Sequence, residues 1–187
     1  MKHCDQSFSI RSFGEKVPQL GERVFIDRSA VVIGDVTIGD DSSIWPQCAL
    51  RGDMHFIRIG KRTSIQDVTL CHVTHDSDYN PEGYPLVIGD DCTIAHQVTL
   101  HGCKVGNRVL VGMGATVMDG AVIEDDVVVG AGSLVPPGKT LASGFLYLGS
   151  PVKQVRPLTE NEMAFFTYSA NNYRKLKDQY LLEDEAE

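Results

Sequence analysis

The most regular feature of this 187-residue chain is an aliphatic position that returns every six residues. A small residue or valine stands two positions before most members of the series. A period of six is neither the period of about 3.6 of an amphipathic helix nor the simple alternation of a half-buried strand. The clearest uninterrupted run is Val105, Val111, Val117, Ile123, Val129 and Val135.

Each hexapeptide fits a short strand followed by a turn, so three of them close one triangular coil of about 18 residues. The aliphatic residue and the small residue before it point inward, while Gly, Asp and Asn form the corners. Stacked coils bury a continuous apolar column. Over about residues 15–150 this pattern resembles hexapeptide-repeat proteins, and it predicts an all-β fold, a left-handed parallel β-helix, as a domain over residues 1–158.

Two places break the period. Between Leu50 and Ile59 the step is nine residues, and residues 72–87 leave the frame altogether. The second break contains HDSDYNPEGYP, which is rich in turn formers and predicts a loop at about residues 74–85. We expect both breaks to loop out, so that the coils on either side stay in register. Two interpretations of residues 74–85 remain: a functional loop, or an insertion without a function.

Residues 159–187 are predicted to form a C-terminal helix and an acidic tail. Thr159 and Glu162 have the spacing of a capping box, which starts a helix that should run to about Leu182. Residues 178–187 carry five acids and no Lys or Arg, and we expect a solvated end. The predicted buried face, which would pack on the β-helix or on a neighbouring subunit, contains Met163, Phe166, Ala170, Tyr173 and Leu176.

Composition excludes several classes of function. A net charge of −8 argues against nucleic-acid binding. No run approaches the roughly 18 apolar residues that span a bilayer, and the N-terminal stretch lacks the apolar region of a signal peptide. We therefore expect a cytoplasmic protein without nucleic-acid or membrane partners. Its cysteines form no CxxC pair and should be free, buried thiols: Cys4, Cys48, Cys71, Cys92 and Cys103.

Two histidines occupy equivalent positions in successive coils. Arg51, His72 and His101 each follow the third aliphatic position of their set, so the three side chains should stack along one outer edge. Adjacent strands lie about 4.8 Å apart, so His72 and His101 can converge on one ion. His96 falls on another side of its coil, above Asp67 of the coil before.

A complete metal site then needs a second chain. His96 and His101 point outward on different sides of a coil, so a neighbouring subunit would have to bring its His96 to His72 and His101. In a threefold-symmetric trimer this contact repeats and makes three equivalent sites. Three imidazoles with an open fourth position are a catalytic Zn²⁺ arrangement, and Fe²⁺ or Co²⁺ suits the same ligands. For each histidine alone, the competing interpretation is a solvated surface residue.

Several motifs resemble those of the γ-class carbonic anhydrases and their bacterial relatives. They are RGD at 51–53, SIQD at 64–67, His72, and HQVTLHG at 96–102. The endings YLGSPVKQVRPLTENE and YSANNYRKLKDQY extend the similarity to the short YrdA-like bacterial proteins. The resemblance implies a homotrimeric lyase in which Zn²⁺, held between subunits by His72, His96 and His101, carries a hydroxide that hydrates CO2 to bicarbonate.

The resemblance also implies roles around the metal. Arg51 and Asp53 would form an ion pair at the subunit contact, Gln66 would position the metal-bound water, and Asp67 would be a nearby carboxylate that orients groups or pairs across the interface. Four further residues are candidates for supporting contacts or proton transfer: His75, Tyr168, Asn172 and Tyr173.

The chain departs from the family pattern at two positions. Met54 stands where the best-known enzymes have a glutamate in an acidic loop, and Ser64 stands where the family often has Asn. Two other functions are therefore open, because fold alone decides no function. One is a hexapeptide acyltransferase or acyl-CoA thioesterase, in which a histidine acts as general base. The other is a metal-binding assembly subunit without turnover.

Overall fold

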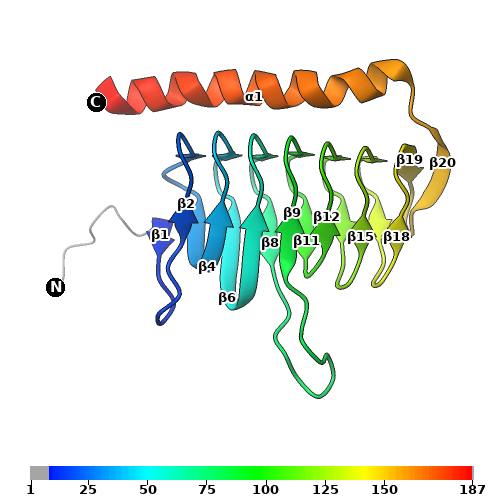
Figure 1. Cartoon of the computed structure of the whole chain (residues 1–187), viewed down its shortest axis with the longest axis horizontal. Coiled ribbons are helices and arrows are strands. Elements are labelled where there is room, and N and C mark those ends of the chain that lie inside the picture. Colours follow the sequence, from blue (N-terminus) through cyan, green and yellow to red (C-terminus); the bar gives the residue numbers. More distant parts are fainter. Residues whose placement is uncertain (1–8, 187) are drawn as a thin grey trace.

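The computed structural model describes residues 9–186, which form a column of stacked β-coils with one long helix laid along it (Figure 1). This confirms the predicted parallel β-helix of hexapeptide repeats followed by a C-terminal helix. Among the described residues, no helix has the length and apolar character needed to cross a membrane. His3 and Cys4 lie outside the described residues.

The strands are short and follow one another at turns. Their bounds are β1 (Ile10–Arg11), β2 (Gln19–Leu20), β3 (Phe25–Ile26), β4 (Val31–Ile38), β5 (Ser43–Ile44), β6 (Ala49–Ile59), β7 (Ser64–Ile65), β8 (Leu70–His72), β9 (Leu86–Ile88), β10 (Thr93–Ile94), β11 (Thr99–His101), β12 (Lys104–Val105), β13 (Leu110–Val111), β14 (Thr116–Val117), β15 (Val122–Ile123), β16 (Val128–Val129), β17 (Leu134–Val135), β18 (Thr140–Leu141), β19 (Phe145–Leu148) and β20 (Lys153–Pro157).

Three strands make each regular coil, one for each wall. β13, β14 and β15 form one coil, and each pairs in parallel with its counterpart among β16, β17 and β18. Leu110 pairs with Val128 and Thr116 with Leu134, so each partner lies 18 positions further on. The coil therefore has the length that the period of six predicts.

The core is the column of inward aliphatic and small side chains. Ile65, Ile94, Val111 and Val129 occupy one inner row and have no exposed surface. The described cysteines, at positions 48, 71, 92 and 103, are free and buried, as predicted. Burial raises the pKa of the Cys48 thiol to about 11, so this side chain packs as a neutral group.

The nine-residue step between Leu50 and Ile59 is not a loop, and that prediction is wrong. The chain stays extended through β6, which pairs with β4 on both sides of a bulge. Gly34 pairs with Gly52 and Val36 with Ile57, so residues 53–56 lie opposite Asp35 alone. A Cβ at Gly34 would lie 2.5 Å from the Gly52 carbonyl oxygen, so glycine permits this close approach.

The second interruption does form the predicted loop. It leaves the column between β8 and β9 and hangs from one corner, on the side away from the helix (Figure 1). Thr74 and Tyr84 bridge its two arms, with backbone hydrogen bonds of 3.0 and 2.9 Å.

The helix α1 (Glu160–Ala186) begins at the predicted capping box. The Thr159 N–H donates to Glu162 Oε2 at 2.8 Å, and the Glu162 N–H donates to Thr159 Oγ1 at 3.3 Å. From there α1 runs back over the coils toward the N-terminal end of the column (Figure 1). Phe166 and Ala170 are buried against the wall, as predicted, but Met163 is 40% exposed because the buried stripe begins only at Phe166.

The far half of α1 is held by charge. The Lys177 side chain is fully buried, and its Nζ donates to Asp41 at 2.9 Å and to Asp178 at 2.6 Å. Arg23 also donates to Asp178, at 2.6 Å, and Arg28 pairs with Asp184 at 3.0 Å. The expected solvated acidic end is wrong at Asp178, whose side chain is 24% exposed, whereas Asp184 is exposed as expected. The helix continues past Leu182 and brings both acids to arginines of the first coils.

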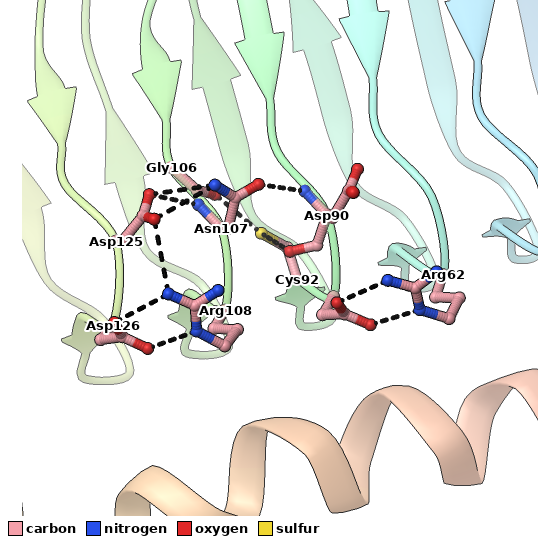
Figure 2. Close-up of polar contacts among 9 residues, drawn as sticks. Arg62, Asp90, Cys92, Gly106, Asn107, Arg108, Asp125 and Asp126 are labelled. Carbon is pink, nitrogen blue, oxygen red and sulfur yellow. Dashed lines mark hydrogen bonds and ion pairs between the residues drawn. The ribbon is translucent and has the colours of Figure 1, made fainter.

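One corner of the column carries a ladder of alternating charge. Arg62 donates to both Asp91 oxygens, at 2.6 and 2.7 Å. Arg108 likewise donates to both Asp126 oxygens, at 2.6 and 2.9 Å (Figure 2). A slip of one coil would place like charges opposite each other, so the ladder favours the observed register. Its six members have φ between +52° and +58° and are Arg23, Asp41, Arg62, Asp91, Arg108 and Asp126.

Candidate metal site

His72 and His101 lie side by side on adjacent coils. They are direct partners in the pairing of β8 with β11, and both follow an inward residue at the end of a strand. Their ring centroids are 5.0 Å apart, and His72 Nδ1 lies 3.0 Å from His101 Nε2. The stacking that the repeat frame predicts for these two histidines is therefore present.

The other ring nitrogen of each histidine faces a carboxylate. His72 Nε2 lies 3.3 Å from Asp53 Oδ1, and His101 Nδ1 lies 2.6 Å from Asp119 Oδ1. When those two nitrogens carry the protons, the nitrogens 3.0 Å apart direct lone pairs at each other. Such a pair needs a cation between them, either a proton or a metal ion. Two nitrogens bound tetrahedrally to Zn²⁺ at about 2.0–2.1 Å would lie roughly 3.3 Å apart, so the observed pair would have to open slightly to admit a metal ion.

Local charge favours the metal-binding form of His72. Burial, followed by the positive charge of Arg51, lowers the pKa of His72 and keeps its imidazole neutral. Arg51 Nη1 donates to Asp53 Oδ2 at 2.6 Å within the same chain. Burial opposes ionisation of Asp53, but Arg51 and His72 outweigh it and lower the pKa of Asp53. The position of the Arg51–Asp53 pair at a subunit contact stays a prediction.

Asp119 is a site residue that the sequence interpretation did not find. Besides facing His101, it accepts a hydrogen bond from Thr74 Oγ1 at 2.8 Å, so the first residues of the loop brace it. Gly102 has a φ of +51°, and a Cβ there would overlap Asp119 Oδ1 and the Tyr84 side chain, which explains the glycine directly after His101. Asp119 follows His101 by 18 positions, one full coil, and counting along the repeat would have revealed it.

His96 lies on another wall, as predicted. It follows β10, whose sheet is separate from that of β8 and β11. His96 Nδ1 lies 2.9 Å from Asp67 Oδ2, which leaves Nε2 as the outward-facing nitrogen, and both side chains are more than two-fifths exposed. Within residues 9–186 of one chain, no group of three or more His, Cys, Asp or Glu side chains is placed to hold a metal ion. One chain therefore supplies two converging histidines and, separately, a third.

The remaining candidates divide between the loop and the helix. His75 is exposed in the loop, and Met54 is 44% exposed. Tyr168, Asn172 and Tyr173 line a groove between α1 and the wall that also contains Gln66 and His96. Burial raises the pKa of the Tyr173 phenol, and Gln66 partly opposes this shift. The structure thus gathers the helix candidates near His96, while His75 makes no comparable contact among the described residues.

Comparisons with known proteins identify the family of this chain. The family model described as "Bacterial transferase hexapeptide (six repeats)" matches residues 18–52 and 102–137. The chain is 60% identical to Protein YrdA of Escherichia coli over 92% of this chain and 94% of that protein. It is 42% identical to mitochondrial Gamma carbonic anhydrase 1 of Arabidopsis thaliana, over 91% of this chain and 62% of that protein. The chain belongs to the γ-carbonic anhydrase-like hexapeptide-repeat family.

The same fold is found in a solved structure of a protein that is named as a hexapeptide transferase family member. A hexapeptide transferase family protein from Anaplasma phagocytophilum superposes with a TM-score of 0.85 at 39% identity, covering 92% of this chain and 98% of that one. The γ-carbonic anhydrase-like family therefore shares its scaffold with proteins named as transferases, and the site residues must decide between the activities.

Proposed function

We propose that this protein is a homotrimer that binds a divalent metal ion, first of all Zn²⁺, at each subunit interface and hydrates CO2 to bicarbonate. His72 and His101 of one subunit and His96 of the next are the proposed ligands. Likeness to Gamma carbonic anhydrase 1 supports the activity. Fe²⁺ and Co²⁺ suit the same nitrogen ligands.

The observation that carries the proposal is the pair of facing ring nitrogens, 3.0 Å apart, on His72 and His101. His72 Nε2 faces Asp53, His101 Nδ1 faces Asp119, and His96 Nδ1 faces Asp67. All three proposed ligands thus share one pattern, a carboxylate behind an imidazole. This pattern fixes the tautomer of a metal-binding histidine and raises its basicity.

A divalent metal, when bound, acts as a Lewis acid that makes water nucleophilic at neutral pH. The chain's own residues would prepare the site for this. Asp53, Asp67 and Asp119 hold the three imidazoles in orientation, and Arg51 keeps Asp53 ionised. Gln66 lies next to His96 with a buried Nε2 donor that has no protein partner among the described residues, so it can orient an oxygen atom near the ligands.

The site must also release a proton in each turnover. His75 is an exposed imidazole in the loop whose first residues brace Asp119, so we propose it as the group that passes this proton to buffer. A His75→Ala variant should bind metal normally but hydrate CO2 more slowly in dilute buffer, with recovery at high imidazole concentration. Equal rates for His75→Ala and the unmodified protein in dilute buffer would remove His75 from the account.

The test of the whole proposal combines three measurements on the full chain: the oligomer mass, the metal content after anaerobic loading with Zn²⁺ or Fe²⁺, and the stopped-flow rate of CO2 hydration. We expect trimers with about one metal ion per chain. His96→Ala should lose the metal and the activity. The control Tyr79→Ala, at a loop position that is 93% exposed, should keep both.

Other outcomes point to the alternative functions. Trimers that hold metal but do not hydrate CO2 would favour an assembly subunit without turnover. Turnover of an acyl-CoA that survives removal of the metal would favour an acyltransferase or thioesterase. A monomer, or a protein that takes up no metal under both loading conditions, would contradict the proposal.

A further inference from the structure

A groove with a volume of about 470 Å³ runs between α1 and the wall built from β7, β10, β13 and β16. Its origin lies in one outward row of that wall, made by the residue after each inward aliphatic position. Along this row the side chains shrink from coil to coil while the helix continues over them. The row is Trp45, Gln66, Ala95, Gly112 and Gly130.

The groove is closed at its polar end, where Gln66 follows Trp45 in the row. Near the closed end Trp45 packs against Tyr173 with ring centroids 6.1 Å apart, and the hydroxyls of Thr93 and Ser169 hold the helix to the wall at 2.7 Å. Its apolar lining includes Met113 and Phe165. The polar residues Gln66 and His96 line the same groove, so an apolar space adjoins a proposed metal ligand.

Gln66 indicates what the groove binds. The side chain is only 3% exposed and lies beside the Tyr173 phenol, yet its Nε2 has no acceptor within hydrogen-bond distance among the described residues. A buried amide donor without a partner is unfavourable, and an oxygen acceptor on a ligand would satisfy it. The groove, with a volume of about 470 Å³, has room for a ligand much larger than CO2, since a water molecule takes only about 30 Å³.

We propose that this groove is an acyl pocket, which binds a short-chain carboxylate or carboxylic acid derivative. The carbonyl oxygen accepts a hydrogen bond from Gln66 Nε2, and the hydrocarbon chain lies along Met113 and Phe165 beneath α1. This inference rests on the proposed function, since it places the carbonyl carbon beside His96. It adds a substrate class that CO2 hydration does not need.

The experiment titrates the full-length protein, metal-free and metal-loaded, with sodium hexanoate and with sodium acetate. The signal is the ¹³C methyl resonance of Met113, which lines the groove, and Met118, outside the groove, is the internal reference. We expect a saturable shift of Met113 with hexanoate. Acetate should bind at least about tenfold more weakly, because it lacks the chain that fills the pocket.

Two substitutions make the test specific. Ala95→Leu fills the groove and should abolish the shift, whereas Ala164→Leu, the same change at an exposed helix position outside the groove, should preserve it. Gln66→Met should weaken hexanoate binding, and Gln179→Met on the outer helix surface should not.

Some results would overturn the acyl pocket. They are the absence of a saturable shift, equal affinity for acetate and hexanoate, or hexanoate binding that Ala95→Leu leaves unchanged. A groove filled by a neighbouring subunit would give the first of these. Failure of the proposed function is distinguishable, since a protein that takes up no metal can still show the Met113 shift, and a metal-loaded trimer can fail to show it.

Discussion

The carboxylate of Asp119 should set the affinity of the site for metal through His101. The Oδ1 atom lies 2.6 Å from His101 Nδ1 and holds the proton there, which leaves Nε2 as the ligand. In Asp119→Asn the amide can turn its NH2 group toward Nδ1. The proton then moves to Nε2, the nitrogen that must bind the metal.

The size of the effect follows from the lost charge. A hydrogen bond to a charged group contributes about 1.5–3 kcal/mol and a neutral one about 0.5–1.5 kcal/mol. The difference between these ranges is about 1–1.5 kcal/mol, and loss of the partner behind a metal ligand typically weakens metal binding about 10–100-fold. Because the His101 and Asp119 side chains are 35% and 30% exposed, the low end of that fold range applies. We expect a loss of about 1.4 kcal/mol per site, or about tenfold weaker metal binding.

Competition with a chromogenic chelator measures this affinity on the trimer, and ¹⁵N resonances of His101 report the tautomer in the metal-free protein. Thr74→Val, which removes the hydroxyl that braces Asp119, should show a smaller loss in the same direction. Asp78→Asn makes the same charge change at an exposed position in the loop and should bind metal normally. Asp119→Asn affinity within twofold of the unmodified protein, with an unchanged tautomer, would refute the reasoning.

Two further predictions concern the helix. Lys177 is fully buried and donates to two carboxylates that are 29% and 24% exposed, so Lys177→Met should lower the free energy of unfolding by about 2 kcal/mol, less than the 3–5 kcal/mol of a fully buried pair; an unchanged denaturation midpoint would contradict this. Arg156, with the Thr159 N–H, lowers the pKa of Glu162 to about 2 from 4.5, so the capping interaction is complete above pH 4.5 and is lost as the pH falls through about 2. The Thr159 amide resonance should titrate near pH 2, and a midpoint near 4.5 would be the opposite result.

The regular part of the fold is predictable because burial repeats with the coil. Ile94, Val111 and Val129 occupy one buried row, and the six-residue period reports that row directly. The extra residues after Leu50 were misassigned because counting steps does not distinguish a loop from a bulge. The distinguishing signal is the pair Gly34 and Gly52, whose backbones approach too closely for a Cβ.

Contacts in the candidate site were predictable from the sequence where the contacting residues stand out from the common residue types of the repeat. His72 with His101, and His96 with Asp67, follow from equal places in neighbouring coils, and the structure brings each pair together. Asp119 was missed because aspartate is also the common corner residue of this repeat. The groove under α1 was not predictable, since it depends on where the helix lies across the wall.

The central claim is that each metal site takes ligands from two chains, and subunit mixing tests it most directly. His72→Ala and His96→Ala chains each lack every complete site when assembled alone. After the two variants are unfolded, mixed in equal amounts and reassembled, an interface is complete when one chain supplies His72 and its neighbour supplies His96. Random assembly makes that arrangement at about one quarter of the interfaces, so the mixture should bind about one quarter of the metal bound by reassembled unmodified protein. A mixture that binds no more metal than either variant alone would contradict the account.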